Sequence, residues 1–165
     1  MAHTIRTMTE QDWPSVKRIY EQGIATKNAT FEKSAPTYEQ WIRQAPPACR
    51  LVLEEQQNIL GWCKISRVST REVYAGVGET SVYIDLNEKG KGIGTLLLQE
   101  LIRQSETAGF WMLQAAIFPE NEASIKLHLN NGFRIVGVRE RIGKRDGVWR
   151  DNVFLERRSN VVGVD

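Results

Sequence analysis

"ETSVYIDLNEKGKGIGTLLLQELI", residues 79–102, contains the features that decide the fold. Its first part alternates polar and apolar residues, which is typical of a strand. Its last part is rich in leucine at the spacing of an amphipathic helix. Glycines at positions 90, 92 and 94 separate the two parts. The stretch therefore predicts a strand that passes through a glycine turn into the N-terminus of a helix.

The glycine turn is suited to an anion. Backbone N–H groups at a helix N-terminus, together with the helix dipole, attract negative charge, and two lysines stand among the glycines. The spacing fits neither a Walker A loop nor a dinucleotide fingerprint, so a different pyrophosphate would be the ligand. A tight turn without any ligand is an equal alternative. The residues that would hold the anion are Lys89, Gly90, Lys91, Gly92, Ile93, Gly94 and Thr95.

Length and composition limit the possible classes of protein. A chain of 165 residues predicts one domain, 1–165, and a net charge of +2 argues against a nucleic-acid partner. No apolar segment is long enough for a signal peptide or a membrane span, so we expect a cytoplasmic protein without a membrane partner. Cys49 and Cys63 lack the spacing of metal ligands, and no metal site is expected.

The order of periodic segments predicts an α/β domain with a mixed sheet and helices on both faces. Expected strands cover 3–8, 50–55, 59–68, 77–86, 110–118, 133–141 and 147–157. Expected helices cover 9–23, a short segment at 38–44, the leucine-rich segment that Gly109 ends, and 120–132. Thr9 and Asp12 predict the first helix start, and Gly23 its end. Residues 159–165 are expected to form a flexible tail.

The strand before the glycine turn carries a polar face. Because side chains alternate along a strand, Glu79, Ser81 and Tyr83 share one face, and Val82 and Ile84 point to the other. A stripe exposed to solvent would have this pattern too. A carboxylate on a covered central strand, however, is costly without a partner or a role, so we favour Glu79 as a general base.

The segment "NEASIKLHLNN" has a second unusual polar stripe. At 3.6 residues per turn, Asn121, Ser124 and His128 fall on one side of the helix, where an ordinary core helix would have Leu or Ala. A core histidine satisfied by hydrogen bonds is the simpler reading. The stripe it shares with Asn121 and Ser124 favours a functional role, because histidine gains and loses protons near neutral pH.

Together these segments resemble the GNAT superfamily of acetyl-CoA-dependent N-acetyltransferases. Its pyrophosphate signature, Gln/Arg-x-x-Gly-x-Gly/Ala, is met by Lys89, Gly92 and Gly94, with Lys in the first position. Within the superfamily, the phosphinothricin and methionine sulfoximine acetyltransferase branch is similar in four places. These are "ATFE", the Glu-x-Ser-Val-Tyr segment, "PENEASIKLHLNNGF" and "GVWRD".

The resemblance implies a mostly antiparallel sheet and acetyl-CoA as the cofactor. It implies acetyl transfer to the α-amine of a small amino acid or analogue by direct attack in a ternary complex, in a homodimer paired through the C-terminal strands. Glu79 would be the base and His128 the acid, with Tyr83 as its rival. Asn121 and Ser124, and the backbone of Val82 and Ile84, would hold the coenzyme arm. Another amine or peptide N-terminus as acceptor, or a non-catalytic coenzyme-binding module, are the alternatives.

The resemblance also implies candidates for the acceptor pocket, in loops and in the C-terminal strands. Each of these side chains could equally lie on the surface or in the core. The candidates are Phe31, Glu32, Arg71, Lys144, Arg145 and Trp149.

Overall fold

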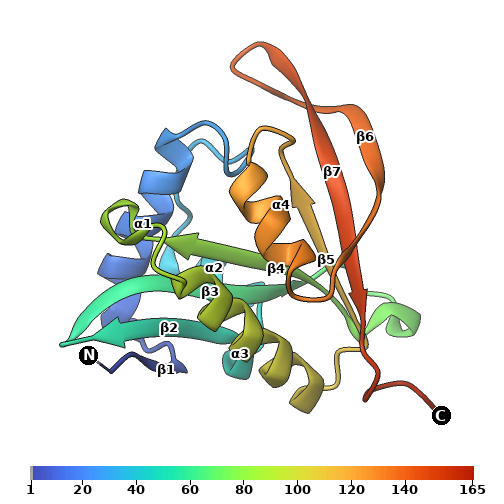
Figure 1. Cartoon of the computed structure of the whole chain (residues 1–165), viewed down its shortest axis with the longest axis horizontal. Helices are drawn as coiled ribbons and strands as arrows, with labels where there is room; N and C mark the ends of the chain where they lie inside the picture. The colour runs from blue at the N-terminus through green and yellow to red at the C-terminus, as the bar shows by residue number, and fades with distance from the viewer. Residues whose placement is uncertain (1) are drawn as a thin grey trace.

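The computed structural model describes residues 2–165, which form one seven-stranded sheet with helices on both faces (Figure 1). The strands are β1 Thr4–Thr7, β2 Arg50–Glu55, β3 Asn58–Arg67, β4 Val77–Ile84, β5 Met112–Ile117, β6 Arg134–Arg145 and β7 Val148–Arg158. The α-helices are α1 Trp13–Ala25, α2 Tyr38–Arg43, α3 Ile93–Thr107 and α4 Glu122–Leu129. Short 3₁₀ helices are η1 Glu10–Asp12, η2 Pro47–Cys49, η3 Glu72–Tyr74 and η4 Leu86–Glu88. The predicted order of strands and helices is confirmed.

The sheet is antiparallel except at its centre. Its strand order is β1-β2-β3-β4-β5-β7-β6, and only β4 and β5 run parallel among the described strands. Their pairing is short, from Val77 opposite Met112 to Glu79 opposite Gln114. Beyond Glu79 the two strands point apart, as Figure 1 shows. The sheet is therefore split at its middle, on the C-terminal side of this pair.

Each face of the sheet has its own apolar core. On one face α1 and α2 pack on β2 and β3 through a cluster that includes Val16, Ile19, Trp41 and Trp62. On the other face α3 contributes Leu97, Leu98 and Leu101 to a larger cluster. Partly buried Ile125 and Leu127 of α4 pack against this larger cluster. The expected placement of helices on both faces is confirmed.

The first helix differs from the prediction at its C-terminus. Thr9 caps the 3₁₀ helix η1, where Asp12 Oδ2 accepts a hydrogen bond from the Thr9 N–H at 2.8 Å, and the α-helix itself begins after Asp12, at Trp13. The expected end at Gly23 is wrong, since α1 continues to Ala25. A Cβ at position 23 would lie 2.6 Å from Cε2 of Tyr83. This glycine therefore serves close packing of the helix on β4 rather than helix termination.

The C-terminal residues are held by an arginine. The Arg158 guanidinium donates to the carbonyl oxygens of Ser159 at 3.0 Å, Val162 at 2.9 Å and Gly163 at 2.6 Å. The Ser159 hydroxyl donates to Glu106 of α3. These contacts connect the tail to β7 and α3, and the flexibility expected for residues 159–165 stays a prediction. Within residues 2–165, no helix has the length and apolar character needed to cross a membrane.

Candidate active site

The split between β4 and β5 leaves backbone groups of β4 without a strand partner. The Asp85 N–H donates to the Leu60 carbonyl at 2.9 Å, and the pairing of β4 with β3 continues without a shift. Only alternate residues of an antiparallel strand bond to the same neighbour. The N–H groups of Val82 and Ile84 therefore point away from β3, into the split.

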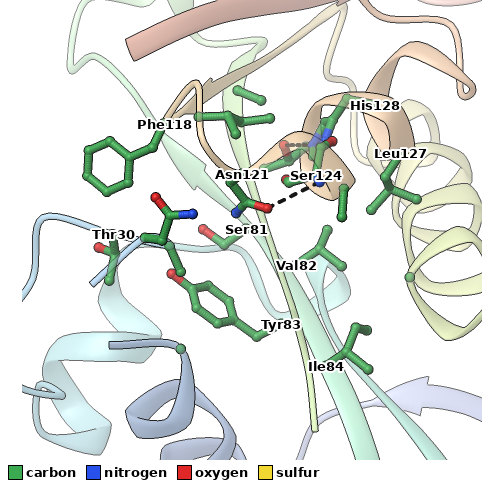
Figure 2. A pocket seen from close by; sticks show the side chains of 18 of the residues that line it. Thr30, Ser81, Val82, Tyr83, Ile84, Phe118, Asn121, Ser124, Leu127 and His128 are labelled. Carbon is green, nitrogen blue, oxygen red and sulfur yellow. Dashed lines mark hydrogen bonds between the residues drawn. The ribbon is translucent and has the colours of Figure 1, made fainter. Parts of the chain in front are cut away.

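A cavity of about 830 Å³ occupies this split. In Figure 2, Thr30, Tyr83 and Phe118 lie on one side of the strand that carries Ser81, and Leu127 and His128 lie on the other. The cavity therefore passes between the two faces of the sheet. The predicted site residues that line it are Phe31, Glu79, Val82, Tyr83, Ile84, Lys89, Gly90, Gly92, Ile93, Gly94, Thr95, Asn121, Ser124 and His128.

One end of the cavity is formed by the glycine turn. Gly92 is the N-cap of α3 with a φ of 81°, and its N-terminal amides receive no side-chain cap. Gly90 also has a positive φ, and a Cβ at either glycine would meet nothing within 4 Å. The open space in front of uncapped amides fits a phosphate group. Lys89 lines the cavity here, whereas Lys91 is outside it and pairs with Glu88 at 2.8 Å.

Asn121 and Ser124 shape the neighbouring helix start. Asn121 is the N-cap of α4, and its side-chain oxygen accepts from the Ser124 N–H at 3.3 Å (Figure 2). Both residues line the cavity on the same side as the glycine turn. The polar stripe that the sequence shows therefore caps the helix and faces the cavity.

His128 is buried, and both of its ring nitrogens have partners. Nδ1 lies 2.8 Å from the Ser124 carbonyl oxygen, and Nε2 lies 3.0 Å from Thr80 Oγ1. A carbonyl only accepts, so Nδ1 carries the proton. Nε2 of the neutral ring then accepts from the Thr80 hydroxyl, which lies closer to it than to its other acceptor, the Gln114 carbonyl oxygen at 3.4 Å. Burial lowers the pKa of His128, although the bond to Ser124 opposes this shift. At neutral pH the ring is therefore uncharged and has no proton on the nitrogen that faces Thr80.

The lowered pKa makes stability depend on pH. Below the ordinary value of 6.5, the unfolded chain binds a proton at His128 that the folded chain does not yet bind. The free energy of unfolding contributed by this residue is therefore complete above pH 6.5 and is lost as the pH falls through the folded-state pKa. We expect H128Q to show a smaller loss of stability than the unsubstituted protein between about pH 7.5 and about pH 5.5.

Urea unfolding at both pH values measures this difference. The two proteins differ only at residue 128, so the contributions of all other groups cancel in the comparison. If the free energy of unfolding changes equally with pH in the two proteins, the pKa of His128 is not lowered.

On the other face, Glu79 lines the cavity at the last position of β4 that pairs with β5. Its Oε1 accepts a hydrogen bond from Gln114 Nε2 at 3.1 Å, which orients the carboxylate. The side chain is half-buried, and no cation pairs with it within residues 2–165. A carboxylate that is oriented but not neutralised is able to accept a proton from a bound ligand.

Tyr83 follows on the same face of β4. Its ring stacks on Trp62 with centroids 4.8 Å apart and packs edge-on against Tyr20 at 5.0 Å. Burial raises the pKa of its hydroxyl strongly, and only a hydrogen bond with Thr30 and the charge of Arg145 oppose this. The phenol therefore stays protonated at neutral pH.

Several candidates for the acceptor pocket lie outside the cavity. Phe31 does line it and packs edge-on against Phe118 at 4.8 Å. Arg71 is exposed beside the Tyr74 ring. Exposed side chains at 144 and 149 contact each other, with the lysine 5.6 Å from the indole centroid. The candidates that do not line the cavity are Glu32, Arg71, Lys144, Arg145 and Trp149.

Arg145 is buried and holds the loop after α1. Its guanidinium donates to the carbonyl oxygens of Thr30 at 2.8 Å and Ile24 at 2.9 Å. The structure thus gives this residue contacts with the backbone rather than a place in the pocket. Its effect on the site is indirect, because the loop that it holds carries Thr30 and Phe31 of the cavity wall.

Substitution of Arg145 tests this structural role. We expect R145M to lower the free energy of unfolding by about 2–4 kcal/mol, because two charge-assisted hydrogen bonds are lost and two carbonyls lose their donors. Urea denaturation measures the loss. The matched control is K144M at the neighbouring exposed position, expected within about 0.5 kcal/mol of the unsubstituted protein. Equal stability of the two variants would contradict the account.

Four polar residues of the site were not predicted from the sequence. Thr80 lies beside His128, and Gln114 orients Glu79. Arg139 and Asn152 line the cavity from the last two strands. A threonine on the same face of β4 as Val82 and Ile84 was a readable signal. The other three residues reach the site only because of the order of the strands in the sheet, which local sequence patterns do not show.

The comparisons with known proteins agree with this geometry. Residues 5–154 match the family described as "Acetyltransferase (GNAT) domain". An L-methionine sulfoximine/L-methionine sulfone acetyltransferase of Pseudomonas paraeruginosa is 29% identical, with 94% of each chain covered. A phosphinothricin N-acetyltransferase of Alcaligenes faecalis is 30% identical, covering 96% of this chain and 84% of the relative.

A solved structure is similar over the whole chain. It is a GNAT superfamily phosphinothricin acetyltransferase from Sinorhizobium meliloti in complex with AcCoA, with a TM-score of 0.88 and 28% identity. The alignment covers 100% of this chain and 92% of that one. Acetyl-CoA is the acetyl donor of GNAT enzymes, and the uncapped glycine turn fits its diphosphate. The chain belongs to the GNAT acetyltransferase family.

Proposed function

We propose that this acetyltransferase acts on the α-amine of a small amino acid or amino-acid analogue, by direct attack in a ternary complex. One observation carries the proposal: a single cavity passes through the split sheet, with an anion-binding turn on one face and the Glu79 carboxylate on the other. The relatives support the acceptor class, since one is named for L-methionine sulfoximine and sulfone and another for phosphinothricin.

The roles of the residues follow from their places. Bound acetyl-CoA supplies an acetyl group activated as a thioester. The amides of Gly92 to Thr95, with Lys89, hold its diphosphate, and Asn121 and Ser124 border its arm. The N–H groups of Val82 and Ile84, which lack a strand partner in the split, orient the arm and the carbonyl. Glu79 takes the proton that the acceptor amine loses, directly or through water.

Two residues are candidates for returning a proton to the departing sulfur. His128 is neutral, with Nε2 as an acceptor, so it has no proton to donate from that atom at neutral pH. Tyr83 keeps its proton because burial raises its pKa. Tyr83 therefore has a proton at neutral pH, although the raised pKa makes it a weak acid, and we propose it over His128 for this role. In Y83F the ring stacking is retained, so a loss of kcat larger than that in H128Q supports this assignment, and the reverse order contradicts it.

Thiol release from acetyl-CoA tests the acceptor class. The panel contains L-methionine sulfone, phosphinothricin, common L-amino acids, a polyamine and a short peptide. We expect the highest kcat/KM with the amino acids and intersecting initial-rate lines, as a ternary complex requires. Preference for the polyamine or peptide would contradict the acceptor class, and parallel lines would contradict direct transfer. No thiol release with any acceptor would favour the non-catalytic coenzyme-binding alternative.

We propose further that the protein is a cytoplasmic homodimer. The edge strand β6 exposes four aliphatic side chains in the described structure, and an exposed apolar edge favours association with a second chain. They are Ile135, Val136, Val138 and Ile142. Light scattering after gel filtration measures the mass of the assembly, and a monomer at micromolar concentration would contradict the dimer.

A further inference from the structure

Arg139 brings a positive charge to the same face of the sheet as Glu79. It pairs with Asn152 of β7 in the register of the sheet, and both residues line the cavity. Its guanidinium carbon lies 4.0 Å from the centroid of the Phe154 ring. Phe154 in turn pairs with Ala116 of β5, which also lines the cavity. The guanidinium therefore leans from β6 over β7 toward the split.

No carboxylate neutralises this arginine within residues 2–165. Nearby acids on β7 are engaged elsewhere: Glu156 pairs with Arg134, and Asp151 accepts from the Arg141 N–H. The Asn152 side chain makes no hydrogen bond to another described residue either. Arg139 and Asn152 thus offer free donors to a ligand.

The other cations of the cavity are on the opposite face. Lys89 stands at the start of α3, and Lys126 belongs to α4. Both helices pack on the face that carries the glycine turn. Arg139 is therefore the cavity-lining cation on the Glu79 face among the described residues.

We propose that Arg139, assisted by the Asn152 amide, binds the α-carboxylate of the acceptor amino acid and so places its amine at Glu79. This inference rests on the proposed function. A guanidinium presents two parallel donors that match a carboxylate, and the Phe154 ring restricts its orientation. β7 lies two strand spacings, roughly 10 Å, from β4. The Phe154 ring under the guanidinium lies two residues, roughly 7 Å, along β7 from Glu156, which is level with Glu79 through Gln114. With the side chains reaching from both strands, that gap suits one amino acid lying across it.

Arg139 and Asn152 would also make the enzyme select amino acids over other amines. An amine without a carboxylate leaves the guanidinium of Arg139 unpaired in the pocket and gains nothing from it. A dipeptide would move its carboxylate one residue away from Arg139. The site therefore selects for an amine and a carboxylate on the same carbon.

The test compares acceptors with and without the carboxylate. Wild type, R139A and R139K are assayed for thiol release with L-methionine sulfone and with its carboxamide. We expect R139A to lower kcat/KM for L-methionine sulfone on the order of 10- to 100-fold, mainly by raising KM. For the carboxamide, R139A and wild type should have about the same kcat/KM. R139K should recover part of the loss, because it restores the charge without the two-donor geometry.

A binding measurement removes the dependence on turnover. Calorimetry with N-acetyl-L-methionine sulfone, which keeps the carboxylate, should show weaker binding to R139A than to wild type. The matched control is R134A on the same strand, whose arginine pairs with Glu156 and does not line the cavity. R134A should keep the wild-type kcat/KM for both acceptors and the wild-type affinity for the product.

The outcomes separate the two proposals. Wild type that acetylates the carboxamide but not L-methionine sulfone contradicts the proposed acceptor class and overturns this inference with it. If wild type acetylates L-methionine sulfone and R139A loses the same factor of kcat/KM for both acceptors, the proposed function is supported but Arg139 does not bind the carboxylate. If R139A has wild-type kinetics and wild-type affinity for the product, the role of Arg139 is likewise overturned.

Discussion

E79Q will lower kcat by about 10²- to 10⁴-fold, the range that a positioned general base contributes. The amide keeps the size of the side chain and its contact with Gln114 Nε2 through the amide oxygen, but it cannot take a proton. Acetyl-CoA should bind E79Q as it binds wild type, because the glycine turn lies on the other face of the sheet. Steady-state thiol release and calorimetry with acetyl-CoA measure the two properties.

Two controls make this result specific. E72Q changes an exposed carboxylate of η3 that does not line the cavity, and it should keep wild-type kcat. Thermal unfolding of E79Q should match wild type within about 0.5 kcal/mol, as expected for a half-buried residue that keeps its shape. A kcat for E79Q within threefold of wild type, in folded protein, would contradict the assignment of the base.

G92A will weaken the binding of acetyl-CoA on the order of 10- to 100-fold, the worth of one or two charge-assisted hydrogen bonds. The new methyl group would stand in the open space before the uncapped amides of α3. Alanine at a φ of 81° also costs about 1–2 kcal/mol of stability. Calorimetric Kd and urea unfolding separate the two effects.

The chain offers a matched control at the other end of the same helix. Gly109 has a φ of 90°, and a Cβ there also meets nothing within 4 Å, but the residue does not line the cavity. G109A should therefore lose as much stability as G92A and bind acetyl-CoA with the wild-type Kd. If both variants weaken binding equally, the loss comes from stability, and the anion site is not at Gly92.

The sequence was sufficient for the order of elements because their signals are local. Alternation, helical spacing and the hairpin residues Gln56-Gln57 and Asp146-Gly147, all with positive φ, act over a few residues. The relation of Glu79 to Tyr83 and of Asn121 to His128 follows from the same short periods. Local periodicity therefore predicted which side chains share a face.

What the sequence could not predict depends on contacts between distant segments. Arg145 bonds carbonyls 115 and 121 residues away, so nothing near it in the sequence distinguishes it from exposed Lys144. Gly23 is a glycine because the Tyr83 ring lies against it, not because the helix ends there. The place of Arg139 depends on the strand order β5-β7-β6, which local patterns do not determine.

Diphosphate binding at the glycine turn is tested most directly by following the backbone amides while acetyl-CoA is added to ¹⁵N-labelled protein. We expect the largest ¹H–¹⁵N shifts at Gly92, Ile93, Gly94 and Thr95, with Gly109 unmoved as an internal reference. Adenosine, which lacks the diphosphate, should leave those four signals in place. If saturating acetyl-CoA shifts other amides but leaves those of residues 92–95 unchanged, this turn does not hold the diphosphate.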